Sequence, residues 1–181
     1  MADCRWRMAE HGFRLRHPPS AICHPPSAIC HLVFRRGNTI LAMKFVCLTE
    51  SDSERAAREI ARSLSPNAVV HLVGDLGAGK TFVARAIAAE LGADPKEVAS
   101  PSFAIIHEYP RTGAPSIIHI DGYRLSENRR EWLEIGIPEL LTGPGIKLIE
   151  WPKREFEEFE DSHVEVAIEV RDDGAREITV H

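Results

Sequence analysis

The chain has 181 residues, which fits one domain, and 44% of them are hydrophobic, enough for a sizeable core. No apolar run approaches the roughly 18 residues of a membrane span, and the basic N-terminus lacks the uninterrupted apolar region of a secretory signal, so we expect a cytoplasmic protein. The net charge is −5: residues 1–42 hold six Arg against two acidic residues, whereas residues 43–181 hold sixteen Lys and Arg against twenty-five Asp and Glu, a poor surface for direct nucleic-acid binding.

The first 42 residues differ in character from the rest. Residues 17–30 repeat the unit HPPSAIC twice, and three of the four cysteines precede residue 43, which is no disulfide framework for a folded core. The Cys and His residues of the repeat could ligate a metal, but the Pro-Pro pairs and the spacing fit no usual zinc pattern. We predict a disordered or non-native leader over 1–42, a domain over 43–181, and a natural translation start at Met43.

From Met43 the pattern predicts alternating strands and helices. In chain order we expect a strand (44–49), a helix with a Ser or Asp cap (51–64), a strand (68–73), a helix from residue 80 to a stop at Gly92, strands (103–109 and 116–121), a partly helical region broken at Gly136 and Pro138 (127–141), a strand (146–151), and a closing hairpin around Asp172-Asp173-Gly174.

The segment GDLGAGKT, residues 74–81, matches the phosphate-binding pattern G-x-x-x-x-G-K-[ST] between a buried strand and a helix. Its glycines let successive backbone N–H groups point at phosphate oxygens, and the helix N-terminus adds positive potential. Lys80 is expected to reach the β- and γ-phosphates, and Thr81 to offer its hydroxyl to Mg²⁺. The predicted nucleotide-binding residues of the loop are Gly74, Asp75, Leu76, Gly77, Ala78, Gly79, Lys80 and Thr81. The fold class that follows is α/β: a single P-loop NTPase-like domain with a central mixed sheet flanked by helices.

Two apolar strands end in a carboxylate, as a magnesium-dependent phosphate site requires. Asp121 ends SIIHID, and Glu150 ends IKLIE. One carboxylate can hold Mg²⁺ and the other can orient the attacking water, and the residues alone leave the allocation open.

Four motifs in order indicate a family. GDLGAGKT is followed by SPSFAIIHEYP (100–110), HIDGYRL (119–125) and LIEWP (148–152). From Met43 to the C-terminus this arrangement resembles the TsaE (YjeE) family, the small bacterial ATPases of tRNA threonylcarbamoyladenosine synthesis. The resemblance implies ATP and Mg²⁺ as cofactors and TsaD and TsaB as partners, with the modification at adenosine 37. It also implies that the nucleotide cycle supports turnover of the TsaB–TsaD catalyst, which holds the tRNA, so that contact with tRNA is indirect.

The resemblance also allocates roles to single residues. Thr81 and Glu150 are the implied Mg²⁺ residues, and Asp121 is the second acidic residue needed for hydrolysis, so that Lys80, Asp121 and Glu150 form the expected catalytic set. Three further positions are implied near the nucleotide: Thr49, Trp151 and Arg176. Gly122 stands where the family commonly has Leu.

Two other readings remain open. A small-molecule P-loop kinase would need an acceptor pocket and a mobile lid with several arginines, for which Arg124, Arg129 and Arg130 are the candidates. A nucleotide-dependent binding module without useful hydrolysis is the second alternative, against which the two strand-end carboxylates argue.

Overall fold

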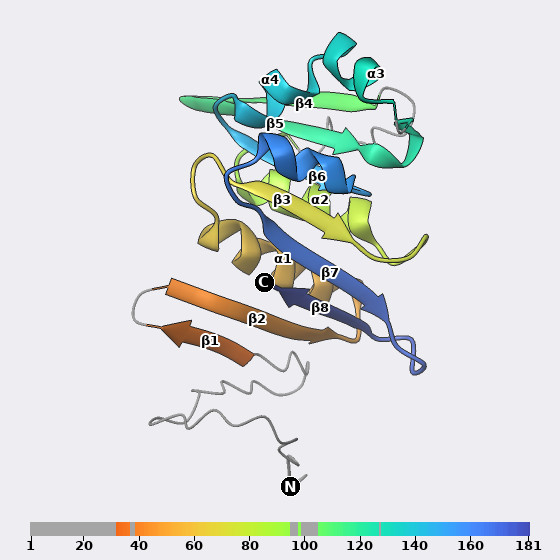
Figure 1. Cartoon of the computed structure of the whole chain (residues 1–181). Helices are drawn as coiled ribbons and strands as arrows, with labels where there is room; N and C mark the ends of the chain where they lie inside the picture. Colours follow the sequence, from red (N-terminus) through yellow and green to blue (C-terminus); the bar gives the residue numbers. More distant parts are fainter. Residues whose placement is uncertain (1–31, 37–38, 95–97, 99–104, 127) are drawn as a thin grey trace, which may run out of the picture.

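The computed structural model describes residues 32–36, 39–94, 98, 105–126 and 128–181, with side chains from Met43 onward. The described chain forms one sheet with helices on both faces (Figure 1). Its strands are β1 (Leu32–Arg36), β2 (Thr39–Cys47), β3 (Val69–Val73), β4 (Ile106–Arg111), β5 (Ala114–Asp121), β6 (Ile146–Glu150), β7 (Val164–Val170) and β8 (Arg176–Val180). The predicted α/β class with a central mixed sheet is confirmed.

The sheet has eight strands in the order β1-β2-β8-β7-β3-β6-β5-β4. Strand β3 pairs in parallel with both β6 and β7, and β5 pairs in parallel with β6. The remaining pairs are antiparallel. The carboxyl ends of β3, β5 and β6 therefore meet at one edge of the sheet, the usual place for a ligand site in an open α/β fold.

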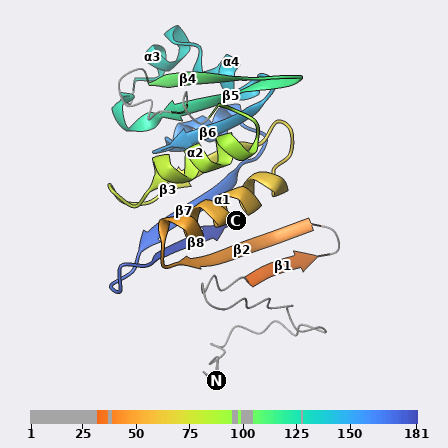
Figure 2. The same ribbon diagram turned by 180° about the vertical axis from the view of Figure 1, so that it is seen from behind.

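Two layers of helix bury the two faces of the sheet. Helices α1 (Glu50–Ser63) and α2 (Lys80–Glu90) pack on one face and lie in front of the sheet in Figure 2. On the other face lie α3 (Arg129–Glu134), α4 (Ile137–Thr142) and the 3₁₀ helix η2 (Arg154–Phe159), while the 3₁₀ helix η1 (Gly122–Arg124) follows β5. Within the described part of the chain, no helix has both the length and the apolar character needed to cross a membrane.

Alternation along the central strand sorts its side chains between the two faces. Val70 and Leu72 of β3 belong to the apolar cluster under α1 and α2, whereas Val69 belongs to the cluster under α3, α4 and η2. By the same period of two, His71 lies on the η2 face. This face carries a second polar cluster, described below.

Two local predictions need correction. The cap of α1 is Thr49 rather than a Ser or Asp. Its hydroxyl accepts from the Asp52 N–H, and the Asp52 carboxylate accepts from the Thr49 N–H, which completes a capping box. Pro138 does not break a helix, because it lies in the first turn of α4, where its missing N–H costs nothing. The predicted break at Gly136 is present, with φ +79° between α3 and α4.

The start of β2 bears on the predicted domain boundary. The strand begins at Thr39, before Met43, and its first part pairs with β1. The pairing of β2 with β8 begins at Met43, opposite Val180, and ends at Cys47. The HPPSAIC repeat lies outside the described residues, and the proposed start at Met43 stays a prediction. The SPSF segment also lies outside the described residues.

Candidate active site

The glycine loop joins β3 to α2 at the carboxyl edge of the sheet. Gly74, Gly77 and Gly79 all have positive φ, at 146°, 82° and 110°. A Cβ at residue 74 would lie 2.3 Å from the Ile168 carbonyl oxygen, so only glycine fits there without a shift of backbone. Gly79 is the N-cap of α2 and supplies no side chain to the first N–H groups of the helix, which leaves them for an anion.

Lys80 is buried inside the loop. Its Nζ donates to the carbonyl oxygens of Gly74 at 2.7 Å and Asp75 at 2.8 Å, and it lies 3.7 Å from the centroid of the Trp151 ring. Burial lowers the pKa of Lys80, while the carboxylates of Glu150, Asp75 and Asp121 act in the opposite direction. The net direction is a lowered pKa, because the effect of burial exceeds that of the three carboxylates.

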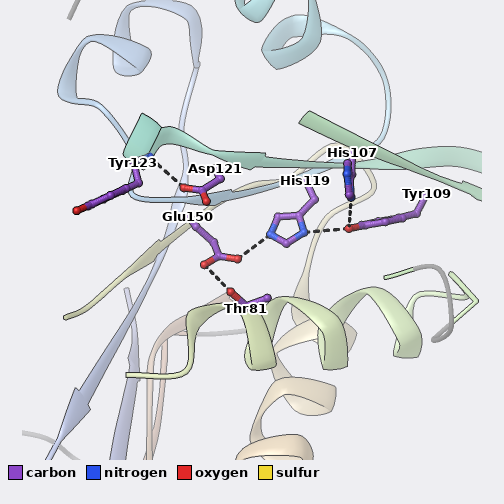
Figure 3. A network of polar contacts seen from close by, with 7 residues as sticks. All are labelled: Thr81, His107, Tyr109, His119, Asp121, Tyr123 and Glu150. Atoms are coloured by element: carbon purple, nitrogen blue, oxygen red, sulfur yellow. Dashed lines mark hydrogen bonds and ion pairs between the residues drawn. The ribbon is translucent and has the colours of Figure 1, made fainter. Parts of the chain in front are cut away.

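A chain of polar contacts links α2 to strands β6, β5 and β4 (Figure 3). The Thr81 hydroxyl donates to Glu150 Oε2 at 2.9 Å, and His119 Nε2 lies 3.0 Å from Glu150 Oε1. The Tyr109 hydroxyl lies 3.2 Å from His119 Nδ1. Both oxygens of the Glu150 carboxylate are therefore fixed, one by the first turn of α2 and one by a buried imidazole.

The second predicted carboxylate lies beside the first. Asp121 and Glu150 are direct partners in the parallel pairing of β5 with β6, and both are buried. Asp121 Oδ1 accepts from the Tyr123 N–H at 3.0 Å, which begins η1 (Figure 3). The two strand-end carboxylates predicted from sequence are thus neighbours on the face that carries Thr81.

A cavity of about 340 Å³ opens over these groups. Its lining residues are Leu76, Gly77, Gly79, Lys80, Thr81, Asp121, Tyr123, Arg124, Glu150 and Trp151. Most of the predicted site residues are brought together here. Gly74, Asp75 and Ala78 contribute backbone to the loop rather than cavity wall.

Arg176 and Thr49, the two predicted positions that precede or follow the loop at a distance in sequence, also lie outside the cavity wall. Arg176, at the start of β8, donates from Nε to the Ala78 carbonyl oxygen at 3.0 Å and so supports the loop from outside. Thr49 is the cap of α1. It stands two residues after Cys47, whose register partner in β8 is Arg176. Arg176 therefore contacts the glycine loop directly, whereas the contact that Thr49 makes caps α1.

Trp151 adopts a backbone conformation that is uncommon for a large residue, with φ +55°. Its ring packs against Tyr123, with centroids 5.2 Å apart. A Cβ at Gly122 would lie 2.3 Å from the Trp151 carbonyl oxygen. Glycine at position 122 thus permits the close approach of the two strand ends that places both aromatic rings at the cavity.

Three residues of the site were not assigned a nucleotide-site role from sequence: His119, Tyr123 and Arg124. A signal for His119 was present, because it stands two residues before Asp121 on a strand and must share its face. Of the three arginines considered for a kinase lid, Arg124 lines the cavity. Arg129 and Arg130 instead form exposed ion pairs with Glu158 and Glu134.

The donor set fits Mg²⁺ and a nucleoside triphosphate. A hydroxyl and a carboxylate lie in hydrogen-bond contact beside a lysine and a run of backbone N–H groups, and hard oxygen ligands are those that Mg²⁺ prefers. A second carboxylate adjoins them at the strand edge. Together these groups can bind a polyphosphate, hold its metal and position a water molecule.

The fold and the loop define a single α/β domain of the P-loop NTPase type. The chain belongs to the TsaE family, since the family model described as "Threonylcarbamoyl adenosine biosynthesis protein TsaE" matches residues 47–178. The resemblance predicted from its motifs is confirmed.

Relatives of known name agree with this assignment. The tRNA threonylcarbamoyladenosine biosynthesis protein TsaE of Treponema pallidum is 35% identical over 138 residues, covering 76% of this chain and 99% of its own. The TsaE protein of Bacillus subtilis is 32% identical over 137 residues, covering 76% and 84%. The crystal structure of Bacillus subtilis YdiB superposes with a TM-score of 0.60 and 28% identity, covering 80% of this chain and 87% of YdiB.

Proposed function

We propose that this protein is a Mg²⁺-dependent ATPase that acts in the formation of N6-threonylcarbamoyladenosine at position 37 of tRNA. In this role it binds and hydrolyses ATP to support turnover of a TsaB–TsaD transferase. The relatives that carry the name of this biosynthesis support the pathway. The excess of acidic residues over 43–181 supports indirect contact with tRNA, held by the partners.

One observation carries the ATPase part of the proposal. Thr81 Oγ1 donates to Glu150 Oε2 at 2.9 Å, and Asp121 is the register partner of Glu150. A loop that only bound phosphate would need no pair of buried carboxylates at this edge. Two carboxylates beside a Lys-Thr pair supply the separate tasks of metal binding and water positioning.

The residues divide the chemistry as follows. Lys80 and the N–H groups of the loop bind the β- and γ-phosphates, and Thr81 and Glu150 hold Mg²⁺, which when bound neutralises charge that develops on the phosphate oxygens. Asp121 orients a water molecule toward the γ-phosphorus and takes up its proton as the new P–O bond forms. The bond from the γ-phosphorus to the β-γ bridging oxygen breaks, leaving ADP and inorganic phosphate. Trp151 and Tyr123 flank the site.

The kinase alternative finds less support in the geometry. Arg129 and Arg130 are engaged in exposed ion pairs on the α3 side, which leaves Arg124 as the arginine of the three that lines the cavity. A lid that closes on a transferred phosphate commonly uses several arginines. The binding-module alternative is disfavoured by Asp121, whose burial beside Glu150 costs free energy that simple binding would not require.

Phosphate release tests the proposal. The full chain is incubated with Mg·ATP, alone and with TsaB and TsaD from the same source, and inorganic phosphate is measured without any added acceptor. We expect release that increases when both partners are present and is lost in Lys80→Ala. Phosphate transfer only to an added small molecule would instead identify a kinase, and slow release that the partners do not increase would favour a binding module.

A further inference from the structure

A second cluster of chemically active side chains lies away from the nucleotide site. His71 is on β3, Glu160 follows η2, and His163 precedes β7. One ligand atom from each of the three residues lies within 4.8 Å of the others. The cluster is on the face of the sheet opposite α2, because His71 alternates with the residues that pack under α1 and α2.

The two imidazoles converge on one carboxylate. His71 Nε2 lies 3.0 Å from Glu160 Oε1 and 3.0 Å from Glu160 Oε2. His163 Nδ1 lies 3.5 Å from Glu160 Oε2. The rings of His71 and His163 are stacked, with centroids 4.0 Å apart and planes at 11°. One nitrogen of each ring therefore faces the same carboxylate from one side.

Glu160 is unusually placed for a carboxylate. Its side chain is 1% exposed, and Oε2 makes no hydrogen bond within the described part of the chain. A buried carboxylate oxygen that makes no hydrogen bond is costly, because burial removes its solvation. The position in front of Oε2, faced by two imidazole nitrogens, is one where a cation would satisfy all three groups together.

The donor set selects the kind of cation. Two imidazole nitrogens and one carboxylate oxygen suit Zn²⁺ and its first-row neighbours, whereas Mg²⁺ and Ca²⁺ prefer oxygen ligands throughout. Donor atoms around a tetrahedral zinc lie about 3.3 Å apart, close to the separations of 3.0 and 3.5 Å from the carboxylate. His163 is 29% exposed, so it can adjust its position, and a water molecule can take the fourth place.

We propose that His71, Glu160 and His163 form a binding site for a divalent transition metal of the zinc type. The metal would join β3, the strand that leads into the glycine loop, to the segment between β6 and β7 that begins at Trp151. Its role is to fasten that segment to the sheet. The proposal stands on the cluster alone and does not depend on the ATPase assignment.

Cobalt titration tests the site in the full chain. Metal-free protein is titrated with Co²⁺, whose visible absorption reports tetrahedral binding. We expect one equivalent to bind with the spectrum of nitrogen and oxygen ligands, lacking the near-ultraviolet thiolate-to-cobalt band that the N-terminal cysteines would give. Glu160→Gln and His163→Ala should each lower the affinity for Co²⁺ at least about 100-fold. His181→Ala, at an exposed histidine outside the cluster, should leave the affinity unchanged.

Thermal unfolding provides a second readout with Zn²⁺ alone. A zinc concentration about 100-fold above Kd should raise the Tm of the wild type by roughly 5 °C, and the rise should be absent in His163→Ala. Because His163 is partly exposed, this variant should fold, which its circular dichroism checks. Equal Co²⁺ binding by the wild type and His163→Ala, or no Co²⁺ bound by the wild type, would overturn the proposal; the cluster would then be an imidazole–carboxylate network.

Discussion

The hydroxyl of Thr81 donates to Glu150 Oε2 at 2.9 Å and thereby joins the first turn of α2 to the end of β6. These residues are 69 positions apart in the chain. The contact places a hydroxyl and a carboxylate at the mouth of the glycine loop, the arrangement that a Mg²⁺-bound triphosphate requires. The neighbouring Asp121 shares the edge but not this contact, so the two carboxylates should differ in function.

Glu150→Gln and Asp121→Asn should fail in different ways. Glu150→Gln keeps the shape but removes the charge that attracts the metal, so the Mg²⁺ concentration needed for nucleotide binding should rise at least about tenfold. Asp121→Asn keeps the Oδ1 acceptor for the Tyr123 N–H, so binding of Mg·ATP should be nearly unchanged while hydrolysis falls roughly 100-fold or more. Nucleotide affinity measured at a series of Mg²⁺ concentrations, together with the rate of phosphate release, distinguishes the two variants. If Asp121→Asn alone shifts the Mg²⁺ requirement, the roles must be exchanged.

His119 should act as a positioning residue for Glu150. Its Nε2 lies 3.0 Å from Glu150 Oε1, on the side away from Thr81. His119→Ala should therefore raise the Mg²⁺ requirement about 10-fold to 100-fold, and His119→Gln should recover part of the loss. Tyr109→Phe removes a hydroxyl that touches His119 but not Glu150, and serves as the matched control with a smaller effect. A normal Mg²⁺ requirement in a folded His119→Ala protein would contradict this role.

The glycine loop and the two carboxylates could be predicted because each depends on a short segment. The loop pattern is contiguous, and a carboxylate after an apolar strand needs only the strand to be recognised. The register that makes Asp121 and Glu150 neighbours could not be predicted, since β5 and β6 are separated by η1, α3 and α4 and pair only in the folded sheet. The assignment of His119 to Glu150 depends on that register, so it too was missed.

The outer strands were harder to predict for a different reason. Strand β2 was expected to begin at 44, but its pairing with β1 extends it back to Thr39. The cluster of His71, Glu160 and His163 likewise could not be predicted from the sequence, because His71 and Glu160 are 89 positions apart. Chemistry assembled from distant strands needs the strand order, which local sequence patterns do not contain.

Residues 1–42 should be dispensable for stability. Among the described strands, β1 is the edge of the sheet and pairs only with β2, while the pairing of β2 with β8 starts at Met43. A chain that begins at Met43 should unfold in urea with a free energy within about 1 kcal/mol of the full chain. A chain that begins at Leu48 also loses the buried Phe45 and Cys47 and should be destabilised by at least about 3 kcal/mol. A large loss already at Met43 would show that the preceding residues contribute to the fold.

Lys147 should make stability depend on pH in the alkaline range. It is 1% exposed on β6 and donates to the Gly143 carbonyl oxygen, and burial lowers its pKa below the ordinary 10.5. Between the lowered pKa and 10.5 the unfolded chain binds more protons than the folded chain, so stability rises with pH across that window. Lys147→Met removes this contribution.

The stability of the wild type relative to Lys147→Met should therefore increase as the pH approaches 10.5 from below. The slope should be at most about 1.4 kcal/mol per pH unit. Urea unfolding at a series of pH values measures it. A difference between the two proteins that stays constant over this range would mean that Lys147 does not titrate with folding.

Binding of Mg·ATP to the wild type and to Lys80→Ala, measured by isothermal titration calorimetry, tests the central claim most directly. Lys80 Nζ donates to the loop carbonyl oxygens of Gly74 and Asp75. Lys80 is also the one basic residue in the loop sequence GDLGAGKT, residues 74–81. We predict stoichiometric binding of one nucleotide by the wild type and a loss of affinity of about 100-fold or more in the variant. Equal affinity in the two folded proteins would contradict the assignment of this loop as the nucleotide site.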